Sequence, residues 1–164
     1  MNAVDPPIEP ATARKKNSEG DQDGKRRLRH LELLLEVTRR MASYGTLDQV
    51  LQALVEMTTT ELNAERGSLF LNDPDTNELY SRVAQGNIQR EIRILNSSGI
   101  AGYVYTSGEA LIIADAYADD RFNRSIDEQT GFQTRNILCV PIKTVKGEVI
   151  GVAQTLNKRT GKFT

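Results

Sequence analysis

The sequence is poor in the residues that build disulfide frameworks and metal centres. Its 164 residues include one Cys, one His and no Trp. A single Cys excludes a disulfide within the chain, and one Cys with one His cannot complete a four-ligand zinc site of the usual type. Cys139 lies inside the apolar run 137–140, where a buried structural thiol is expected, and His30 is remote from it in sequence. A reducing cytoplasm is the simplest setting for such a chain.

Long apolar segments and charge of one sign are also missing. The longest apolar runs, residues 111–114 and 137–140, are far too short to span a membrane, and no apolar signal-peptide core follows Met1. A formal net charge of −1, without a basic stripe carrying interleaved aromatics, argues against a nucleic-acid partner. The sequence contains neither the phosphate-binding loop motif nor the dinucleotide-binding glycine fingerprint, so we expect no catalytic site and no cofactor.

The N-terminal part of the chain is predicted to contain a tail and two helices. Residues 1–25 combine low hydrophobicity with mixed charge and Pro-containing steps, which predicts a disordered tail. A broad leucine stripe predicts a helix over residues 26–43, wide enough to pack on the domain and on a partner helix. Thr46 followed by Gln49 forms a capping box for a second helix.

From residue 67 onward the pattern becomes that of short strands. Apolar segments with turn residues between them predict strands at residues 67–72, 78–85, 91–96, 111–114, 136–143 and 148–157. Helices are followed by strands with further short helices inserted midway. This order predicts an α+β fold around an antiparallel sheet, in one domain with extensions.

Residues 99–141 are the most informative stretch for function, because two short helices are expected there between strands. Ser98 can cap the first helix, and the free backbone N–H groups at such a helix start favour a phosphate. The second helix is expected over residues 124–130, with Asp127 and Thr130 on one face. This arrangement predicts a closed pocket for a small anion.

Two features of the C-terminal half leave alternatives open. Four acidic residues resemble a cation site: Asp115, Asp119, Asp120 and Asp127. Their spacing does not match the calcium loop, and capping and solvated-turn roles are favoured for Asp119 and Asp120. The alternation of the last strand places four side chains on one face: Ile150, Val152, Gln154 and Leu156. If this face is inward, Gln154 needs a partner, which could be a ligand base edge or ribose hydroxyl or a loop carbonyl. An inverted strand is the remaining alternative.

Several motifs together make the chain resemble a known family. They are Gly-Ile-Ala-Gly at 99–102, Asp-Ala-Tyr at 115–117 with Arg-Phe-Asn at 121–123, the run 130–142, and Asn-Lys at 157–158 with Phe163. In these motifs the chain resembles a GAF domain of the cyclic-nucleotide-binding type, as in mammalian cyclic-nucleotide phosphodiesterases and cyanobacterial adenylyl cyclases. The resemblance covers residues 26–164. It implies a central antiparallel sheet with helices packed on one face and short helices closing a pocket on the other.

The resemblance also implies a set of ligand-binding positions. Backbone N–H groups at the start of the first pocket helix would bind the cyclic phosphate, and the threonines would bind phosphate or ribose. The full set is Ser68, Ala84, Gln85, Ile100, Ala101, Asn123, Asp127, Thr130, Thr134 and Gln154. Guanine-binding phosphodiesterase domains carry an aromatic residue and Asp where this chain has Ala84 and Gln85, and Tyr where it has Asn123. Because a Gln amide can pair both ways with adenine, the sequence favours cyclic AMP over cyclic GMP.

The end of the sequence resembles the start of the family's Asn-Lys…Phe…Asp-Glu signature. Asn157, Lys158 and Phe163 would belong to it, the Asp-Glu pair would follow Thr164 with its Asp beneath the pocket paired to Lys158, and the C-terminal helix would be truncated. The resemblance implies a regulatory domain that controls an output domain such as a nucleotide cyclase or phosphodiesterase. A homodimer would form through the N-terminal helix and the missing C-terminal helix.

The sequence also bears on three other functions of this fold. A GAF module for dimerisation and signalling, without cyclic-nucleotide binding, is the main alternative. A bilin photosensor or haem sensor is disfavoured, because covalent bilin attachment in that group needs a pocket Cys, commonly beside His, and Cys139 is followed by Val140 within a strand. Methionine sulfoxide reductases of this fold typically use several cysteines, and this chain has one.

Overall fold

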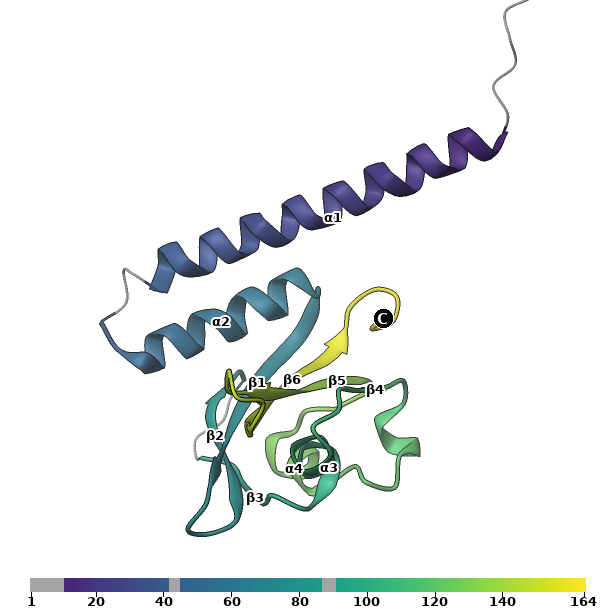
Figure 1. Cartoon of the computed structure of the whole chain (residues 1–164). Coiled ribbons are helices and arrows are strands. Elements are labelled where there is room, and N and C mark those ends of the chain that lie inside the picture. Colours follow the sequence, from purple (N-terminus) through teal and green to yellow (C-terminus); the bar gives the residue numbers. More distant parts are fainter. Residues whose placement is uncertain (1–10, 42–44, 87–90) are drawn as a thin grey trace, which may run out of the picture. The chain divides into compact units, whose positions relative to one another are not determined.

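The computed structural model describes residues 11–41, 45–86 and 91–164 (Figure 1). The chain divides into two units, Met1–Tyr44 and Gly45–Thr164. No helix in the described ranges is both long enough and apolar enough to cross a membrane.

Helix α1 (Ala11–Met41) is the described element of the first unit. It begins well before residue 26, so residues 11–25, for which we predicted disorder, are helical. Low hydrophobicity prevents a segment from forming a core, but it does not prevent a solvent-exposed helix, and no Pro follows Pro10 within this stretch. Residues 1–10 of the predicted tail, and the predicted helix end at 43, lie outside the described residues.

The second unit is built on a six-stranded sheet with the order β3-β2-β1-β6-β5-β4. All neighbouring strands pair antiparallel, which confirms the predicted fold class. The strands are β1 (Ala64–Asp73), β2 (Glu78–Ala84), β3 (Arg93–Leu95), β4 (Leu111–Ile113), β5 (Ile137–Lys143) and β6 (Val149–Lys158). The helices are α2 (Leu47–Glu61), α3 (Gly99–Ser107) and α4 (Ser125–Thr130), with the short 3-10 helix η1 (Ala116–Ala118).

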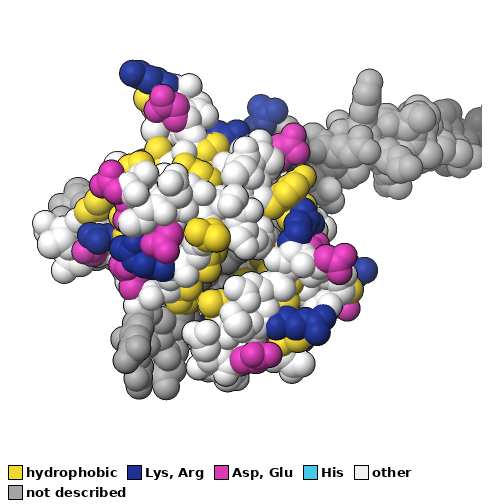
Figure 2. Space-filling view, turned by 90° about the horizontal axis from the view of Figure 1, so that it is seen from below, with side chains coloured by type: hydrophobic (Ala, Val, Ile, Leu, Met, Phe, Trp, Pro, Cys, Tyr) yellow, Lys and Arg dark blue, Asp and Glu magenta, His cyan; other side chains and the backbone are white. Residues whose placement is uncertain are grey.

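The two faces of the sheet bury different side chains. Helix α2 packs over β1 and β2 on one face, and α3 packs over β5 and β6 on the other (Figure 1). Leu69 contributes to the core under α2, whereas its neighbour Phe70 contributes to the core under α3. This alternation follows from the period of a strand, in which successive side chains point to opposite faces. The face that carries α3 and α4 displays acidic and basic side chains interspersed (Figure 2).

Local signals explain where the helices begin and end. The predicted capping box is present, since the Gln49 N–H donates to Thr46 Oγ1 and the Thr46 N–H donates to Gln49 Oε1, both at 3.3 Å. Helices α3 and α4 end at Gly108 and Gly131, which adopt the left-handed conformation with φ of 68° and 65°. Ser98 lies at the start of α3 in an extended conformation, but its side chain makes no capping hydrogen bond.

Candidate functional site

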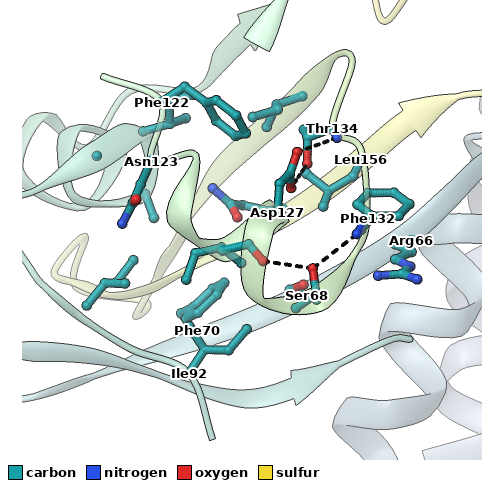
Figure 3. A pocket seen from close by; sticks show the side chains of 18 of the residues that line it. Arg66, Ser68, Phe70, Ile92, Phe122, Asn123, Asp127, Phe132, Thr134 and Leu156 are labelled. Atoms are coloured by element: carbon teal, nitrogen blue, oxygen red, sulfur yellow. Dashed lines mark hydrogen bonds between the residues drawn. The ribbon is translucent and has the colours of Figure 1, made fainter. Parts of the chain in front are cut away.

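A partly enclosed cavity of about 110 Å³ lies on the sheet face that carries α3 and α4 (Figure 3). This volume is far above the ~10–15 Å³ that a cavity needs to hold one water molecule, so the cavity has space for a small organic ligand. Strands β1 and β6 form its floor through Ser68, Phe70, Gln154 and Leu156. The start of α3 and helix α4 enclose the sides.

The cavity brings together the predicted ligand-binding residues, with one exception. Ala84 pairs with Ser68 across β1 and β2 but does not line the cavity. The lining residues from the predicted set are Ser68, Gln85, Ile100, Ala101, Asn123, Asp127, Thr130, Thr134 and Gln154. Their common location follows from the fold, whereas their roles toward a ligand stay predictions.

The start of helix α3 offers unpaired backbone donors to the cavity. Among the residues that the structure describes, none accepts a hydrogen bond from the N–H of Gly99, Ile100 or Ala101, and the first such bond runs from Gly102 N to Ser98 O at 3.1 Å. Unpaired N–H groups and the positive end of the helix dipole favour an anion at this position.

The glycines of the Gly-Ile-Ala-Gly motif allow a tight turn directly before α3 and close packing of the helix start against that turn. Gly99 has φ of 71°, a left-handed conformation that other residues rarely adopt. A Cβ at Gly102 would lie 2.8 Å from the carbonyl carbon of Ser97, so a larger residue would push the helix start away from the preceding turn. The motif thus brings the N–H groups of α3 to the cavity.

Asp127 and Thr134 are bonded to each other in this structure. Asp127 is 5% exposed; its Oδ2 accepts from Thr134 N at 2.6 Å, and its Oδ1 accepts from Thr134 Oγ1 at 2.7 Å. Tyr117 Oη also donates to Oδ2 at 3.1 Å, and burial together with this carboxylate raises the pKa of Tyr117. These bonds connect α4 to the segment that follows it. A ligand that engages these groups through their side chains must share or replace the bonds.

The other polar residues of α4 have local partners as well. Asn123 Oδ1 accepts from Ser125 N at 3.1 Å and from Ser125 Oγ at 2.7 Å, so this side chain caps the start of the helix. Thr130 Oγ1 donates to Ile126 O at 2.8 Å. The helix starts at Ser125, one position after the predicted start at Arg124, because Arg124 occupies the cap position.

The groups on β1, β2 and β6 form the other end of the cavity. Ser68 and Gln154 are cross-strand partners and both line it, so Gln154 faces inward, which excludes the inverted strand. Ile150, predicted on the same face, is 43% exposed and lies at a register shift between β5 and β6, where it has no cross-strand partner on β5. Gln85 differs from expectation, because its Oε1 accepts from Gly67 N at 2.8 Å and from Thr59 Oγ1 at 3.1 Å. The side-chain oxygen of Gln85 therefore already accepts hydrogen bonds from β1 and from α2.

Cys139 on β5 is the cross-strand partner of Gln154 and has the properties of a structural thiol. It is fully buried, and burial raises its pKa to about 12, with a hydrogen bond to Gln154 acting in the opposite direction. A thiol in this environment stays protonated and unreactive.

The acidic residues of the predicted cluster act as caps and ion-pair partners. Asp115 Oδ1 accepts from Tyr117 N at 3.1 Å at the start of η1. Asp119 pairs with the guanidinium of Arg121 at 2.7 Å, which lowers the pKa of Asp119. Within the described ranges, no group of three or more His, Cys, Asp or Glu residues could hold a metal ion. Asp119 thus has a local role of the expected kind, since its Oδ1 also accepts from Arg121 N at 3.0 Å, and Asp115 is the cap of η1.

Asn157 connects the segment after α4 to the sheet. The residue is fully buried and left-handed, with φ of 57°. Its Oδ1 accepts from Arg135 N at 2.6 Å and Asn136 N at 3.4 Å, and its Nδ2 donates to Glu65 Oε2 at 2.9 Å and Gln133 O at 2.8 Å. Through these contacts Asn157 holds residues 133–136, and hence Thr134, against β1 and β6.

The neighbours of Asn157 strengthen this connection. Glu65 pairs with Arg135 at 2.7 Å, and the hydrogen bonds from Arg135 and Asn157 lower the pKa of Glu65. Lys158 Nζ donates to Leu62 O at 2.7 Å and lies 5.8 Å from the centre of the Phe163 ring. The predicted Asp partner of Lys158 stays a prediction.

Several lining residues were missed by the sequence analysis. Most are apolar: Phe70, Ile92, Ile94, Phe122, Ile126, Phe132, Ile137 and Leu156. Arg66, which is charged, is also among these unpredicted lining residues. The alternation Arg66, Ser68, Phe70 along β1 contains the signal, because residues two apart on a strand share a face. Phe132 follows the end of α4 and has no such periodicity.

Comparison with known proteins relates this site to a family. The model of the GAF domain matches residues 46–164. The chain is 39% identical over 147 residues to the dual 3',5'-cyclic-AMP and -GMP phosphodiesterase 11 of Drosophila melanogaster, covering 80% of this chain and 10% of that protein. It is also 39% identical over 144 residues to the probable 3',5'-cyclic phosphodiesterase pde-5 of Caenorhabditis elegans, covering 80% of this chain and 20% of that one. The chain thus spans a small part of these relatives.

Solved structures share the fold at lower sequence identity. The GAF domain of a phosphoenolpyruvate-protein phosphotransferase from Coxiella burnetii has a TM-score of 0.72 and 23% identity, covering 82% of this chain and 80% of that one. The free methionine-R-sulfoxide reductase from Neisseria meningitidis, in complex with its substrate, has a TM-score of 0.66 and 18% identity. This match covers 80% of our chain and 74% of the reductase chain. At these identities the likeness concerns the fold alone.

Proposed function

Because the chain belongs to the GAF domain family, we propose that it is a regulatory domain whose cavity binds a 3',5'-cyclic nucleotide. The observation that carries the proposal is the cavity itself, which has uncapped N–H groups of α3 at one place and the hydroxyl of Ser68 and the amide of Gln154 at another. An anionic phosphate suits the first group, and a base or ribose suits the second. The name of the Drosophila relative includes cyclic AMP and cyclic GMP, which supports the same ligand class.

The signalling mechanism that we propose is closure of α4 over the ligand. Asp127 and Thr134 already bond α4 to the following segment, and Asn157 bonds that segment to the sheet. A ligand that contacts α3 and α4 together stabilises the closed arrangement. Binding changes the activity of an output domain, such as a nucleotide cyclase or phosphodiesterase, only by its difference in affinity for the two states.

The choice of base depends on which groups are free to read it. The sequence favours cyclic AMP through Gln85, but that residue's acceptor is engaged by Gly67 and Thr59. Adenine recognition by Gln85 therefore requires its amide to leave these partners. Cyclic AMP and cyclic GMP both belong in the test.

Isothermal titration calorimetry of this chain with each cyclic nucleotide tests the proposal. We expect heat release and a raised melting temperature with at least one of them. Thr134→Val should weaken binding by about tenfold, since it removes a hydroxyl placed in the cavity, whereas the exposed Thr60→Val should not. If neither nucleotide releases heat or raises the melting temperature, the chain is a dimerisation and signalling module without this ligand.

We also propose that the protein forms a homodimer through α1. The leucines Leu28, Leu31, Leu34 and Leu35 are 58%, 57%, 57% and 70% exposed, and their spacing places an apolar stripe along the helix. Burial of such a stripe against a second copy is favourable. Leu31→Glu should convert a dimer to a monomer in analytical ultracentrifugation, and a wild-type monomer at micromolar concentration would contradict this proposal.

A further inference from the structure

Arg66 is a half-buried cation with no carboxylate partner among the described residues. Among the residues that the structure describes, none forms a hydrogen bond or ion pair with its guanidinium. Arg93, Arg121 and Arg135, in contrast, each pair with a carboxylate. Partial burial of an unpaired charge is costly. A polar ligand in the adjoining cavity would supply the missing acceptors.

The guanidinium of Arg66 is held in a defined position. Its Cζ lies 3.9 Å from the centre of the Phe132 ring, which is a close cation–π contact. Gly86 follows β2 with φ of 113°, and a Cβ there would lie 2.7 Å from the same Cζ, so a larger residue would displace the guanidinium from this position. Arg66 and Phe132 both line the cavity.

Arg66 lies at the end of the cavity away from the start of α3. Figure 3 shows Arg66 beside Phe132 on one side of α4, and Asn123 with Phe122 on the other side. The start of α3 belongs to the second side, because a Cβ at Gly99 would lie 3.6 Å from the carbonyl oxygen of Arg121. A nucleotide whose phosphate binds the N–H groups of α3 therefore directs its base toward Arg66.

The donors of a guanidinium distinguish between purine bases. A 6-oxopurine presents two adjacent acceptors, O6 and N7, which match the paired N–H groups of Arg. A 6-aminopurine presents an amino donor beside N7, and this donor would face the N–H groups of Arg66. We propose that Arg66 is a specificity-determining residue that reads the base, and that the cavity prefers a cyclic nucleotide with a 6-oxopurine base. The inference rests on the proposed function of the cavity as a cyclic-nucleotide site.

Calorimetric titration of the full chain with three nucleotides tests this inference. Cyclic GMP and inosine 3',5'-cyclic monophosphate both carry O6 and N7, whereas cyclic AMP carries the amino group. We expect the wild type to bind both 6-oxopurine nucleotides about tenfold more tightly than cyclic AMP. Arg66→Met and Arg66→Lys should both remove this preference with little change for cyclic AMP, because Lys keeps the charge but not the paired donors.

Arg82→Met is the matched control. Arg82 lies on β2, outside the cavity, and pairs with Asp48 at the surface, so this variant should keep the preference. Melting temperatures of all variants check that they fold. A wild type that binds cyclic AMP more tightly, or Arg66 variants that keep the preference or weaken all three nucleotides equally, would overturn the inference while leaving the proposed function intact. Absence of binding by all three to the wild type would overturn both.

Discussion

Replacement of Asn157 should destabilise the second unit more than any surface substitution. Its fully buried side chain forms three hydrogen bonds of 2.6, 2.8 and 2.9 Å and a longer one of 3.4 Å. With about 1 kcal/mol for each of the two short neutral bonds and about 1.5–3 kcal/mol for the one to the Glu65 carboxylate, the loss of the three short bonds costs about 3.5–5 kcal/mol. For a unit of this size, about 4 °C of melting temperature per kcal/mol gives a decrease of about 14–20 °C.

Asn157→Gly is the variant that isolates the side chain. Glycine accepts the left-handed backbone of this position, whereas Asn157→Ala should lose about 1–2 kcal/mol more, because its Cβ is unfavourable there. Asn77→Gly is the matched control, since Asn77 is also left-handed, with φ of 58°, but lies exposed in the turn between β1 and β2. Thermal unfolding followed by circular dichroism measures all three. If Asn157→Gly melts within about 4 °C of Asn77→Gly, the side-chain hydrogen bonds do not stabilise the unit as argued.

Three further predictions concern the charge, thiol and packing of the same unit. Because the folded pKa of Glu65 is lowered from 4.5, its ionised form stabilises the fold at neutral pH, and this contribution disappears as the pH falls below that value through the folded pKa. Glu65→Gln should therefore lose less stability than the wild type between neutral pH and pH 3 in urea titrations, and a parallel loss would contradict it. Cys139 should not react with a thiol reagent at pH 8 until urea unfolds the protein; rapid reaction of the native protein would refute its burial. Gly151→Ala would press a methyl group into the carbonyl oxygen of Phe70 and should cost at least about 1–3 kcal/mol, whereas Gly45→Ala, whose Cβ would meet only Gln49 Oε1 at an ordinary 3.9 Å, should have little effect on the melting temperature.

The fold was predictable where the local signals are strong. The capping box of Thr46 and Gln49 and the alternation of β5 and β6 locate those elements within about two residues. The start of α1 was not predictable from hydrophobicity, because residues 11–25 are helical without an apolar face of their own. The short helix η1 was also missed, since it depends on Asp115 capping the N–H of Tyr117 rather than on a periodic pattern.

The location of the site was predictable, but the pairing within it was not. Family motifs identify the lining residues Ile100, Asp127 and Thr134, because the motifs keep their spacing along the chain. No sequence pattern indicates that Asp127 bonds to Thr134 or that Gln85 turns its oxygen toward Thr59. These contacts depend on the distance between elements that only the folded sheet sets. The same reason applies to the stacking of Arg66 on Phe132.

The outer strands of the sheet have a consequence for how copies of the protein associate. Strands β3 and β4 lie at the two edges, and each is three residues long. In β3, Arg93 is surrounded by the carboxylates of Asp73, Glu78 and Glu91, so that edge is covered with charge. Strand β4 carries no charge, but it is equally short, and short or charged edges are poor templates for a further strand. Both edges therefore disfavour edge-to-edge aggregation, by charge and shortness at β3 and by shortness at β4, so contacts between copies are expected to use helices instead.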